Sequence, residues 1–426
     1  MKDYLIRKLK EELKPALGCT EPIAIALAAA NSAKHIKGEL NRIELELSGN
    51  ILKNAMGVGI PGTGMIGIDI AAVLGVISGN PDKGLEVLAD ITSDDVAKGK
   101  LIKENDIVAI DVSKRPEKLY IKARIYNQEN NWVETEIVDI HDQIVSIKSE
   151  NEVFLEKVKE EEKNEIKSDE KEITVKAIYD FAMTVDIDEV KFILDTVKLN
   201  SILSEEGLKG DWGLQVGKSI KKSIEKGILQ EDYKNFSLMN TAAAADARMD
   251  GSKLAAMSNS GSGNQGITAT MPVYSVWLKA KKSEDELIRA LLLSNLIPIH
   301  MKKSLGRLSA LCGATIAGVG ASAGIVYLLD GNYDQMIKAM KNQIAGITGL
   351  FCDGAKTSCA LKVASSVDCA FDAAIIALND FGVRGFEGFN DDDIEKTIKN
   401  MALLGNEGMA KTDHMMLDIM IEKAVK

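Results

Sequence analysis

Apolar residues recur at helical spacing at the start of the chain, and further on they alternate with charged residues. Residues 4–14 carry leucines at helical spacing and predict a short amphipathic helix that ends at Pro15. Thr20 is a typical N-cap for a second, strongly apolar helix. Residues 42–48 alternate Ile and Leu with charged residues, which predicts a half-buried strand. The chain therefore begins with helices and continues with sheet.

The pattern changes twice more along the chain. Residues 106–147 contain several strand-like segments, and Asn127–Asn131 between two of them predicts a hairpin loop. Residues 151–172 are dense in both charge signs and predict a solvated helix or linker. After Ile173 we find helical segments separated by Gly and Ser loops, and no strand.

These elements predict an α+β protein with unequal parts. Residues 36–150 form a mixed α/β domain, residues 151–172 connect it onward, and residues 173–426 form a larger all-α region. The N-terminal helices of residues 1–35 are expected to pack on the all-α region.

Composition narrows the function classes. The chain has 426 residues, a formal net charge of -11 and a pI near 5.2, so it lacks the positive field that binds nucleic acid or anionic membranes. No export signal is visible at the N-terminus. Residues 313–329 are apolar but only weakly so, and are expected to form a buried core helix rather than a membrane span. A cytoplasmic protein is expected.

Five cysteines direct attention to thiol chemistry. An odd number in a long chain without an export signal argues against a disulfide framework and favours metal binding or catalysis. Four histidines would contribute little to a His-rich metal site. The alternative is that each cysteine is a small buried hydrophobic residue.

The segment 258–268, SNSGSGNQGIT, is the most unusual stretch. Its glycines would let backbone N–H groups approach a ligand and form a nest for a carboxylate or phosphate. It matches neither the dinucleotide-binding nor the Walker pattern. The alternative is a flexible surface loop. Further side-chain donors and acceptors come from Ser260, Ser262, Asn264 and Gln265.

Cys352 and Cys359 lie seven residues apart. In a continuous helix they would be ~10 Å apart along the axis, so a loop that turns both sulfurs inward is the better interpretation. Cys359 then begins a helix whose dipole favours a thiolate. Cys369 lies ~280° around that helix from Cys359 and is interpreted as core. With Cys312, three thiolates without histidine suit an iron–sulfur cluster with one open iron better than zinc.

Cys19 stands apart from the other four, at a predicted helix N-terminus. The helix dipole there is expected to lower its pKa and supply a thiolate at neutral pH, usable as a base or nucleophile. The alternative is a buried structural thiol.

Five motifs together resemble one known family. They occur in this order: GCTEP at 18–22, KNAMGVGIPGTG at 53–64, SNSGSGNQGI at 258–267, GRLSALCG at 306–313 and CDGAKTSC at 352–359. The chain resembles the L-cysteine desulfidases, oxygen-sensitive relatives of the iron–sulfur L-serine dehydratases, over essentially its whole length. The resemblance implies an α/β portion and a helical catalytic domain of the serine dehydratase α-chain type.

The resemblance also implies roles for individual residues. It assigns Cys19 as the catalytic base and leaves Cys369 without a ligand position. Lys53, Asn54 and the 260–265 loop fall in motifs that hold the polar groups of the amino acid. The ligands of a [4Fe–4S] cluster would be Cys312, Cys352 and Cys359.

The implied reaction is β-elimination of sulfide from L-cysteine, which gives aminoacrylate and then pyruvate and ammonia. Pyridoxal phosphate is not expected. Three other functions fit the residues: an L-serine dehydratase with the same cluster, an iron–sulfur sensor with four ligands, and an amino-acid-binding protein with structural cysteines. A homo-oligomer is compatible with each of them.

Overall fold

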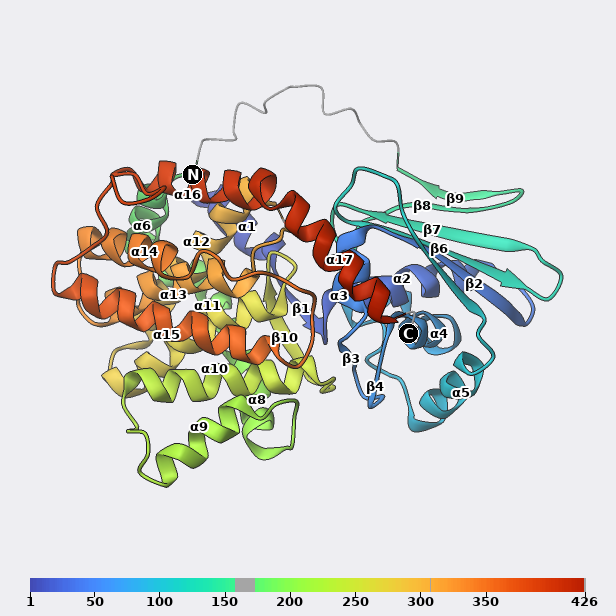
Figure 1. Cartoon of the computed structure of the whole chain (residues 1–426), viewed down its shortest axis with the longest axis horizontal. Coiled ribbons are helices and arrows are strands. Elements are labelled where there is room, and N and C mark those ends of the chain that lie inside the picture. The colour runs from blue at the N-terminus through green and yellow to red at the C-terminus, as the bar shows by residue number, and fades with distance from the viewer. Residues whose placement is uncertain (158–172, 307, 425–426) are drawn as a thin grey trace.

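The computed structural model describes residues 1–157, 173–306 and 308–424. It has two lobes, a helical one and one built on a β-sheet, and the last helix runs along both (Figure 1). The predicted α+β class is confirmed.

The main sheet of the sheet lobe has six strands in the order β5-β2-β6-β7-β8-β9. Only β2 and β5 are parallel; the other neighbours are antiparallel. The strands are β2 (Leu40–Leu47), β5 (Val108–Val112), β6 (Tyr120–Asn127), β7 (Trp132–Val138), β8 (Ile144–Ser149) and β9 (Val153–Glu156). The same lobe holds α2 (Thr20–His35), α3 (Gly49–Ala55), β3 (Gly59–Ile60), β4 (Met65–Ile66), α4 (Ile68–Ser78), the 3₁₀ helix η1 (Pro81–Glu86) and α5 (Ser93–Lys103).

The predicted strands and hairpin are present where the sequence pattern placed them. In β2, buried residues alternate with half-buried ones from Ile43 to Leu47, as the alternation of apolar and charged residues requires. The loop between β6 and β7 closes through a bond from the Asn127 N–H to the Asn131 carbonyl oxygen, 3.1 Å long. Asn130 takes the left-handed conformation (φ 62°) that this tight turn needs.

The helical lobe is arranged around α13, which packs against α11, α12, α14 and α15. Its Gly, Ala and Ser residues allow this close approach, and nearly all of them are buried. The apolar stretch 313–329 is therefore a core helix, and no helix within the described ranges is long and apolar enough to cross a membrane. The elements of this lobe are α1 (Lys2–Glu12), α6 (Val175–Thr184), α7 (Ile187–Val190), η2 (Lys191–Ile193), α8 (Leu194–Lys209), α9 (Val216–Glu225), α10 (Tyr233–Met249), α11 (Gly263–Ala280), α12 (Glu284–Leu305), α13 (Gly313–Leu328), α14 (Tyr333–Ile347), α15 (Cys359–Leu378), α16 (Ile394–Leu403) and the π-helix η3 (Leu404–Gly408).

The two N-terminal helices separate, contrary to the expectation that residues 1–35 pack together on the helical region. Helix α1 contributes Leu5 and Leu9 to the core of the helical lobe. Helix α2 instead packs on β6 and β7 and against α4. The reason is that α2 has no polar face over most of its length, so it is stable only between two apolar layers.

Two strands were missed by the pattern analysis. Strand β1 (Leu13–Leu17) follows α1 and pairs antiparallel with β10 (Ala255–Asn259), so the region after Ile173 is not entirely helical. Both are short, and Pro15 inside β1 is tolerated because the pair has only two strands. The charged segment 151–172 begins with β9 at the sheet edge rather than with a helix or linker; its residues 158–172 lie outside the described ranges.

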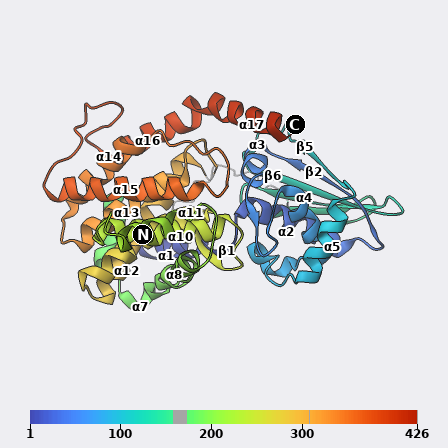
Figure 2. The ribbon, with the colours of Figure 1, turned by 60° about the horizontal axis from the view of Figure 1, so that its bottom comes forward.

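Several contacts between described residues hold the lobes together. The β1–β10 pair joins the chain leading into α2 to the helical lobe. Lys14 in β1 forms an ion pair with Asp142 in the β7–β8 turn, in which Lys14 Nζ lies 2.8 Å from Asp142 Oδ2. Helix α17 (Ala410–Ala424) leaves the helical lobe and packs on α3. In the rotated view α16, η3 and α17 follow one another above the two lobes (Figure 2).

Candidate active site

The GCTEP segment forms the turn into α2 and buries Cys19. Cys19 is the N-cap of α2 and is 3% exposed. Its thiol donates a hydrogen bond to Glu21 Oε2 over 2.9 Å. The next residue, Thr20, donates its hydroxyl to the carbonyl oxygen of Gly261 over 2.8 Å, which fastens the turn to the loop before α11.

Glu21 is the centre of a buried polar network. Besides the thiol, its carboxylate accepts hydrogen bonds from Thr20 Oγ1 (3.1 Å) and Asn54 Nδ2 (3.0 Å). His141, from the β7–β8 turn, places Nε2 3.7 Å from Oε1. Burial raises the pKa of Glu21, but His141 and the hydrogen bond from Cys19 outweigh it and lower the pKa to about 2. Glu21 is therefore a carboxylate at neutral pH.

The low pKa expected for Cys19 is wrong. Burial raises the pKa of this thiol well above its ordinary value, and the neighbouring Glu21 charge adds to the effect. The positive charge of Arg248 acts in the opposite direction without compensating. The helix N-terminus was correctly placed, but the carboxylate two residues on keeps the proton on sulfur.

Backbone pairing brings Cys312 and Cys352 side by side. The Cys312 N–H donates to the Leu350 carbonyl oxygen (3.0 Å), and the Cys352 N–H donates to the Ala310 carbonyl oxygen (2.7 Å). Leu311 and Phe351 between them form an antiparallel bridge. Two segments 40 residues apart in the chain therefore lie next to each other.

Cys359 reaches the same place from α15, where it is the first helical residue, as predicted. Gly354 makes the turn before it possible: its φ is +89°, and a Cβ there would lie 2.3 Å from the Lys53 carbonyl oxygen. Lys356 and Lys362 both pair with Asp353 and brace this turn.

The three thiols interact with one another. Burial raises the pKa of Cys312 to about 12, with further contributions from Cys352 and Cys359. Burial and Cys352 also raise the pKa of Cys359, while Lys356 and Lys362 oppose this. All three are partly exposed and unoxidised. Cys352 and Cys359 thus lie close enough to Cys312 to raise its pKa.

The chemistry of this group suits a cluster better than a single ion. Within the described ranges, no three His, Cys, Asp or Glu side chains are placed to hold one metal ion. A four-iron cluster binds each thiolate to a different iron, so its ligands stand farther apart. Cys312 is the N-cap of α13 and Cys359 opens α15, so both helix dipoles favour anionic sulfur.

Cys369 lies apart from this group, as predicted, but it is half-buried rather than a core residue. It is in α15, and a Cβ at Gly346 would lie 2.8 Å from its sulfur. Burial raises the pKa of Cys369 to about 11, and the other contributions come from charged side chains rather than from cysteines.

The predicted substrate loop is shorter and more internally bonded than expected. Residues 255–259 form β10 and α11 begins at Gly263, with Ser262 as its N-cap. Ser260 Oγ and Gln265 Nε2 both donate to Asn259 Oδ1, over 3.0 and 2.9 Å. Asn264 Oδ1 accepts a bond from Arg248 Nη1 over 3.1 Å. Gln265 Oε1 has no hydrogen-bond partner among the described residues.

The two predicted residues in α3 have different surroundings. Asn54 donates a hydrogen bond to Glu21, and its Oδ1 lies 3.8 Å from the Cys352 sulfur. It therefore connects the Cys19–Glu21 pair with the three grouped thiols. Lys53 is 1% exposed and its ammonium pairs with Asp413 of α17. Lys53 therefore ties α17 to α3.

Four helix N-termini meet at the site. Thr20 links α2 to the loop before α11, and a Cβ at Gly313 in α13 would lie 3.1 Å from Gln265 Oε1. Cys359 of α15 packs against a small group of buried apolar side chains that includes Cys19 and Met249. The positive ends of these dipoles add up, and they favour an anionic cofactor or substrate group.

Sequence reasoning missed roles for Glu21, His141 and Arg248. Glu21 was visible in GCTEP as a first-turn acid of α2. Arg248 was visible as the single cation in the alanine-rich segment TAAAADARM. No signal marked His141, because it enters the site from a turn of the other lobe.

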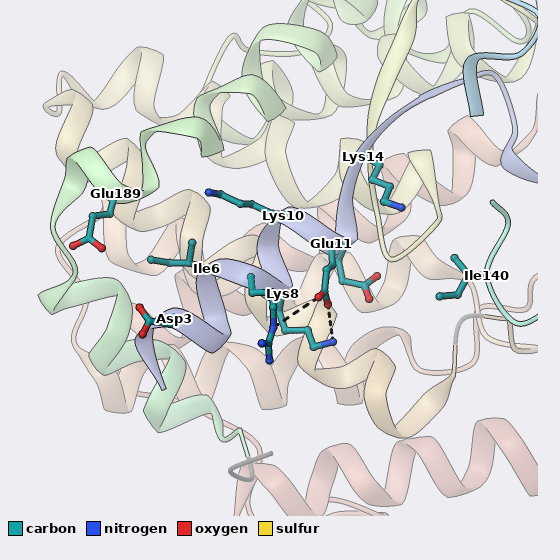
Figure 3. A pocket seen from close by; sticks show the side chains of 10 residues that line it. Asp3, Ile6, Lys8, Lys10, Glu11, Lys14, Ile140 and Glu189 are labelled. Atoms are coloured by element: carbon teal, nitrogen blue, oxygen red, sulfur yellow. Dashed lines mark hydrogen bonds and ion pairs between the residues drawn. The ribbon is translucent and has the colours of Figure 1, made fainter. Parts of the chain in front are cut away.

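A large surface cavity lies elsewhere and carries no comparable chemistry. It has a volume of about 830 Å³ and is lined by charged residues of α1 (Figure 3). Lys8 and Arg7 pair with Glu11 there, 2.8 and 3.8 Å away. None of the five cysteines lines this cavity.

The fold and site define a two-lobed α+β protein with three grouped thiols beside a buried cysteine–glutamate pair. Residues 82–418 match the family described as serine dehydratase alpha chain, and the chain belongs to this family. The matched range contains the three grouped cysteines but not Cys19.

Relatives match over nearly their whole length. A UPF0597 protein of Phocaeicola vulgatus is 45% identical over 99% of this chain and 98% of its own. A UPF0597 protein of Shewanella pealeana is 43% identical over 99% of this chain and 100% of its own. The UPF0597 protein YhaM of Escherichia coli O127:H6 is 43% identical over 98% and 97%. The comparisons thus give the family and not the substrate.

Proposed function

We propose that this protein is an L-cysteine desulfidase, a carbon–sulfur lyase that releases sulfide and leaves aminoacrylate, which becomes pyruvate and ammonia. The observation that supports it is the placement of Cys19 and Glu21 next to the three grouped thiols. An elimination needs both a proton acceptor and leaving-group activation, and these two groups supply one each. The motif resemblance to L-cysteine desulfidases selects sulfide as the leaving group.

Cys312, Cys352 and Cys359 would hold a [4Fe–4S] cluster. When bound, such a cluster supplies an open iron that acts as a Lewis acid toward the leaving sulfur. The three thiols suit such a cluster because all the proposed ligand atoms are sulfur. Two of the thiols lie at helix N-termini, and the positive charges of Lys356 and Lys362 nearby offset the negative charge of bound thiolates. Pyridoxal phosphate is not required.

Cys19 and Glu21 would act together as the base. The Cα–H bond breaks as its proton moves to the Cys19 sulfur, and the original thiol proton passes along the 2.9 Å hydrogen bond to Glu21. The C–H electron pair forms the Cα=Cβ bond while the C–S bond breaks, and sulfide leaves with its electrons. The carboxylate partner accepts the original thiol proton, so the sulfur can take the Cα proton and ends the step as a neutral thiol.

The second candidate is an L-serine dehydratase, which the family match favours. The same residues would remove the Cα proton, and hydroxide would leave in place of sulfide.

Anaerobic purification followed by product analysis tests the proposal. The protein with its iron bound should form sulfide and pyruvate in equal amounts from L-cysteine, without added pyridoxal phosphate, and much faster than pyruvate from L-serine. Equal or faster conversion of L-serine would replace the desulfidase with the dehydratase. Protein that binds iron and converts neither amino acid would favour the iron–sulfur sensor.

A further inference from the structure

One buried cation at the site has no opposite charge. Arg248, at the C-terminal end of α10, is 2% exposed. Its Nη1 donates to Asn264 Oδ1, a neutral partner, over 3.1 Å. Its Nε has no hydrogen-bond partner among the described residues, and no ion pair of the described residues includes it. A buried guanidinium without a counter-ion is costly, so a position that retains one calls for an anion.

Arg248 lies directly against the start of α11. A Cβ at Gly263 would lie 2.1 Å from Arg248 Nε, so the guanidinium packs directly against the first residue of α11. Helix α11 has 18 residues, and its free N–H groups and dipole add positive potential at the same point. The carboxylate of Glu21 bonds to Cys19, Thr20 and Asn54, and no ion pair among the described residues joins it to Arg248. The guanidinium is thus free to bind an anionic group of a ligand.

We infer that Arg248, together with the N-terminus of α11, binds the α-carboxylate of an amino-acid substrate. This inference rests on the proposed function. A guanidinium binds a carboxylate with two parallel hydrogen bonds, which fixes the orientation of the amino acid as well as its affinity.

The position of Arg248 relative to Cys19 fits this role. Its charge acts on the Cys19 thiol, and Met249, the next residue, packs against Cys19. A carboxylate held at Arg248 places the attached Cα beside the Cys19–Glu21 pair. Gly313, next to Cys312, also lies against the start of α11: a Cβ there would be 3.1 Å from Gln265 Oε1 and 3.6 Å from Ser262 Oγ. The substrate would thus lie with its carboxylate at Arg248 and its β-sulfur toward the grouped thiols.

A binding comparison tests the inference. L-Cysteine and cysteamine both carry a thiol and an amine, and only L-cysteine has the carboxylate. Their dissociation constants would be measured by anaerobic calorimetry on iron-loaded protein carrying Cys19→Ser, which should slow turnover by about 10²–10⁴-fold. Adding Arg248→Gln should weaken L-cysteine binding by about 10- to 150-fold, since hydrogen bonds to a charged group contribute about 1.5–3 kcal/mol. Cysteamine binding should change by less than about threefold, well under one tenfold step of 1.4 kcal/mol.

Two further variants complete the design. Arg248→Lys keeps the positive charge but cannot donate two parallel hydrogen bonds. It should therefore weaken the binding of L-cysteine by an intermediate factor and leave cysteamine binding unchanged. Arg289→Gln is the matched control, because Arg289 bonds to the Ala182 carbonyl oxygen in the helical lobe away from the thiols, and it should change neither constant. Cysteamine binding also reports that each variant is folded.

Equal weakening of both ligands in Arg248→Gln or Arg248→Lys would show that Arg248 is structural and would overturn the inference. Unchanged L-cysteine binding would overturn it as well. If L-cysteine binds none of these proteins, Cys19→Ser alone included, the proposed function fails, and this result is distinct from the other two.

Discussion

The thiols of this protein occupy two neighbouring environments with opposite chemistry. Cys312, Cys352 and Cys359 are partly exposed and have lysines nearby, and among the described residues no carboxylate is bonded to their sulfurs. Cys19 is buried and bonded to the carboxylate of Glu21. Under the proposed function this difference separates two tasks: the partly exposed sulfurs near cations would bind metal, and the sulfur paired with a carboxylate would exchange protons.

The largest expected effect breaks the first environment. Replacing Cys312, Cys352 or Cys359 by Ala should abolish the iron content of anaerobically purified protein. Because a metal Lewis acid contributes several kcal/mol to leaving-group departure, turnover should fall by at least about 10³-fold. Iron analysis and sulfide release measure this. Cys369→Ala is the control and should keep both iron and activity; loss of iron in Cys369→Ala alone would invalidate the assignment of ligands.

The second prediction concerns a substitution that disrupts the Cys19–Glu21 pair and leaves the three grouped thiols intact. Glu21→Gln keeps the size of the side chain and removes the proton acceptor. Turnover should fall by about 10²–10⁴-fold, the usual contribution of general base catalysis. Iron content should not change. The matched control is Glu134→Gln, since Glu134 is equally buried but pairs with Arg124 in the sheet. Iron loss in Glu21→Gln would mean that the two environments are not independent.

Asp246 extends the comparison to pH, because burial raises its pKa to about 6. Between about pH 4 and 6 the unfolded chain has released this proton and the folded protein retains it. The free energy of unfolding should therefore fall as pH rises through this range, by at most about 3 kcal/mol. Asp246→Asn should remove this component. Urea unfolding at pH 4 and pH 7 measures it; the same pH difference in Asp246→Asn as in the original protein would contradict the assignment.

The smallest effect concerns Lys53, which the sequence placed in the substrate site and the structure pairs with Asp413. Breaking a buried pair costs about 3–5 kcal/mol, and the partial exposure of Asp413 reduces this. Lys53→Met should lower the free energy of unfolding by about 1–2 kcal/mol with little change in KM. Asp413→Asn is the paired control and should give no further loss in the double variant. A large rise in KM with unchanged stability would return Lys53 to the substrate site.

Local sequence patterns predicted those parts of the fold that depend on neighbouring residues. The alternation in β2, the hairpin at Asn127–Asn131 and the start of α15 at Cys359 are each specified by a few adjacent side chains. Strands β1 and β10 were missed because their pairing joins segments about 240 residues apart, and neither is long enough to show a period.

The sequence indicated which cysteines form the candidate site, but it did not indicate the side chains that surround them. Cysteine spacing indicated the group of three, because few other residues can serve as such ligands. The raised pKa of Cys19 depends on burial and on Glu21, and the position of His141 depends on how the lobes meet. These are properties of tertiary packing, which no local pattern contains.

The most direct test of the division between the two environments is turnover per bound cluster in Cys19→Ser. Serine keeps the shape of the side chain, but its hydroxyl is a far weaker acid and a poor proton carrier. If Cys19 serves proton transfer alone, iron content should equal that of the original protein and turnover per cluster should fall by about 10²–10⁴-fold. Loss of iron would make Cys19 a ligand, and unchanged turnover per cluster would make it a structural thiol; either result would contradict the division.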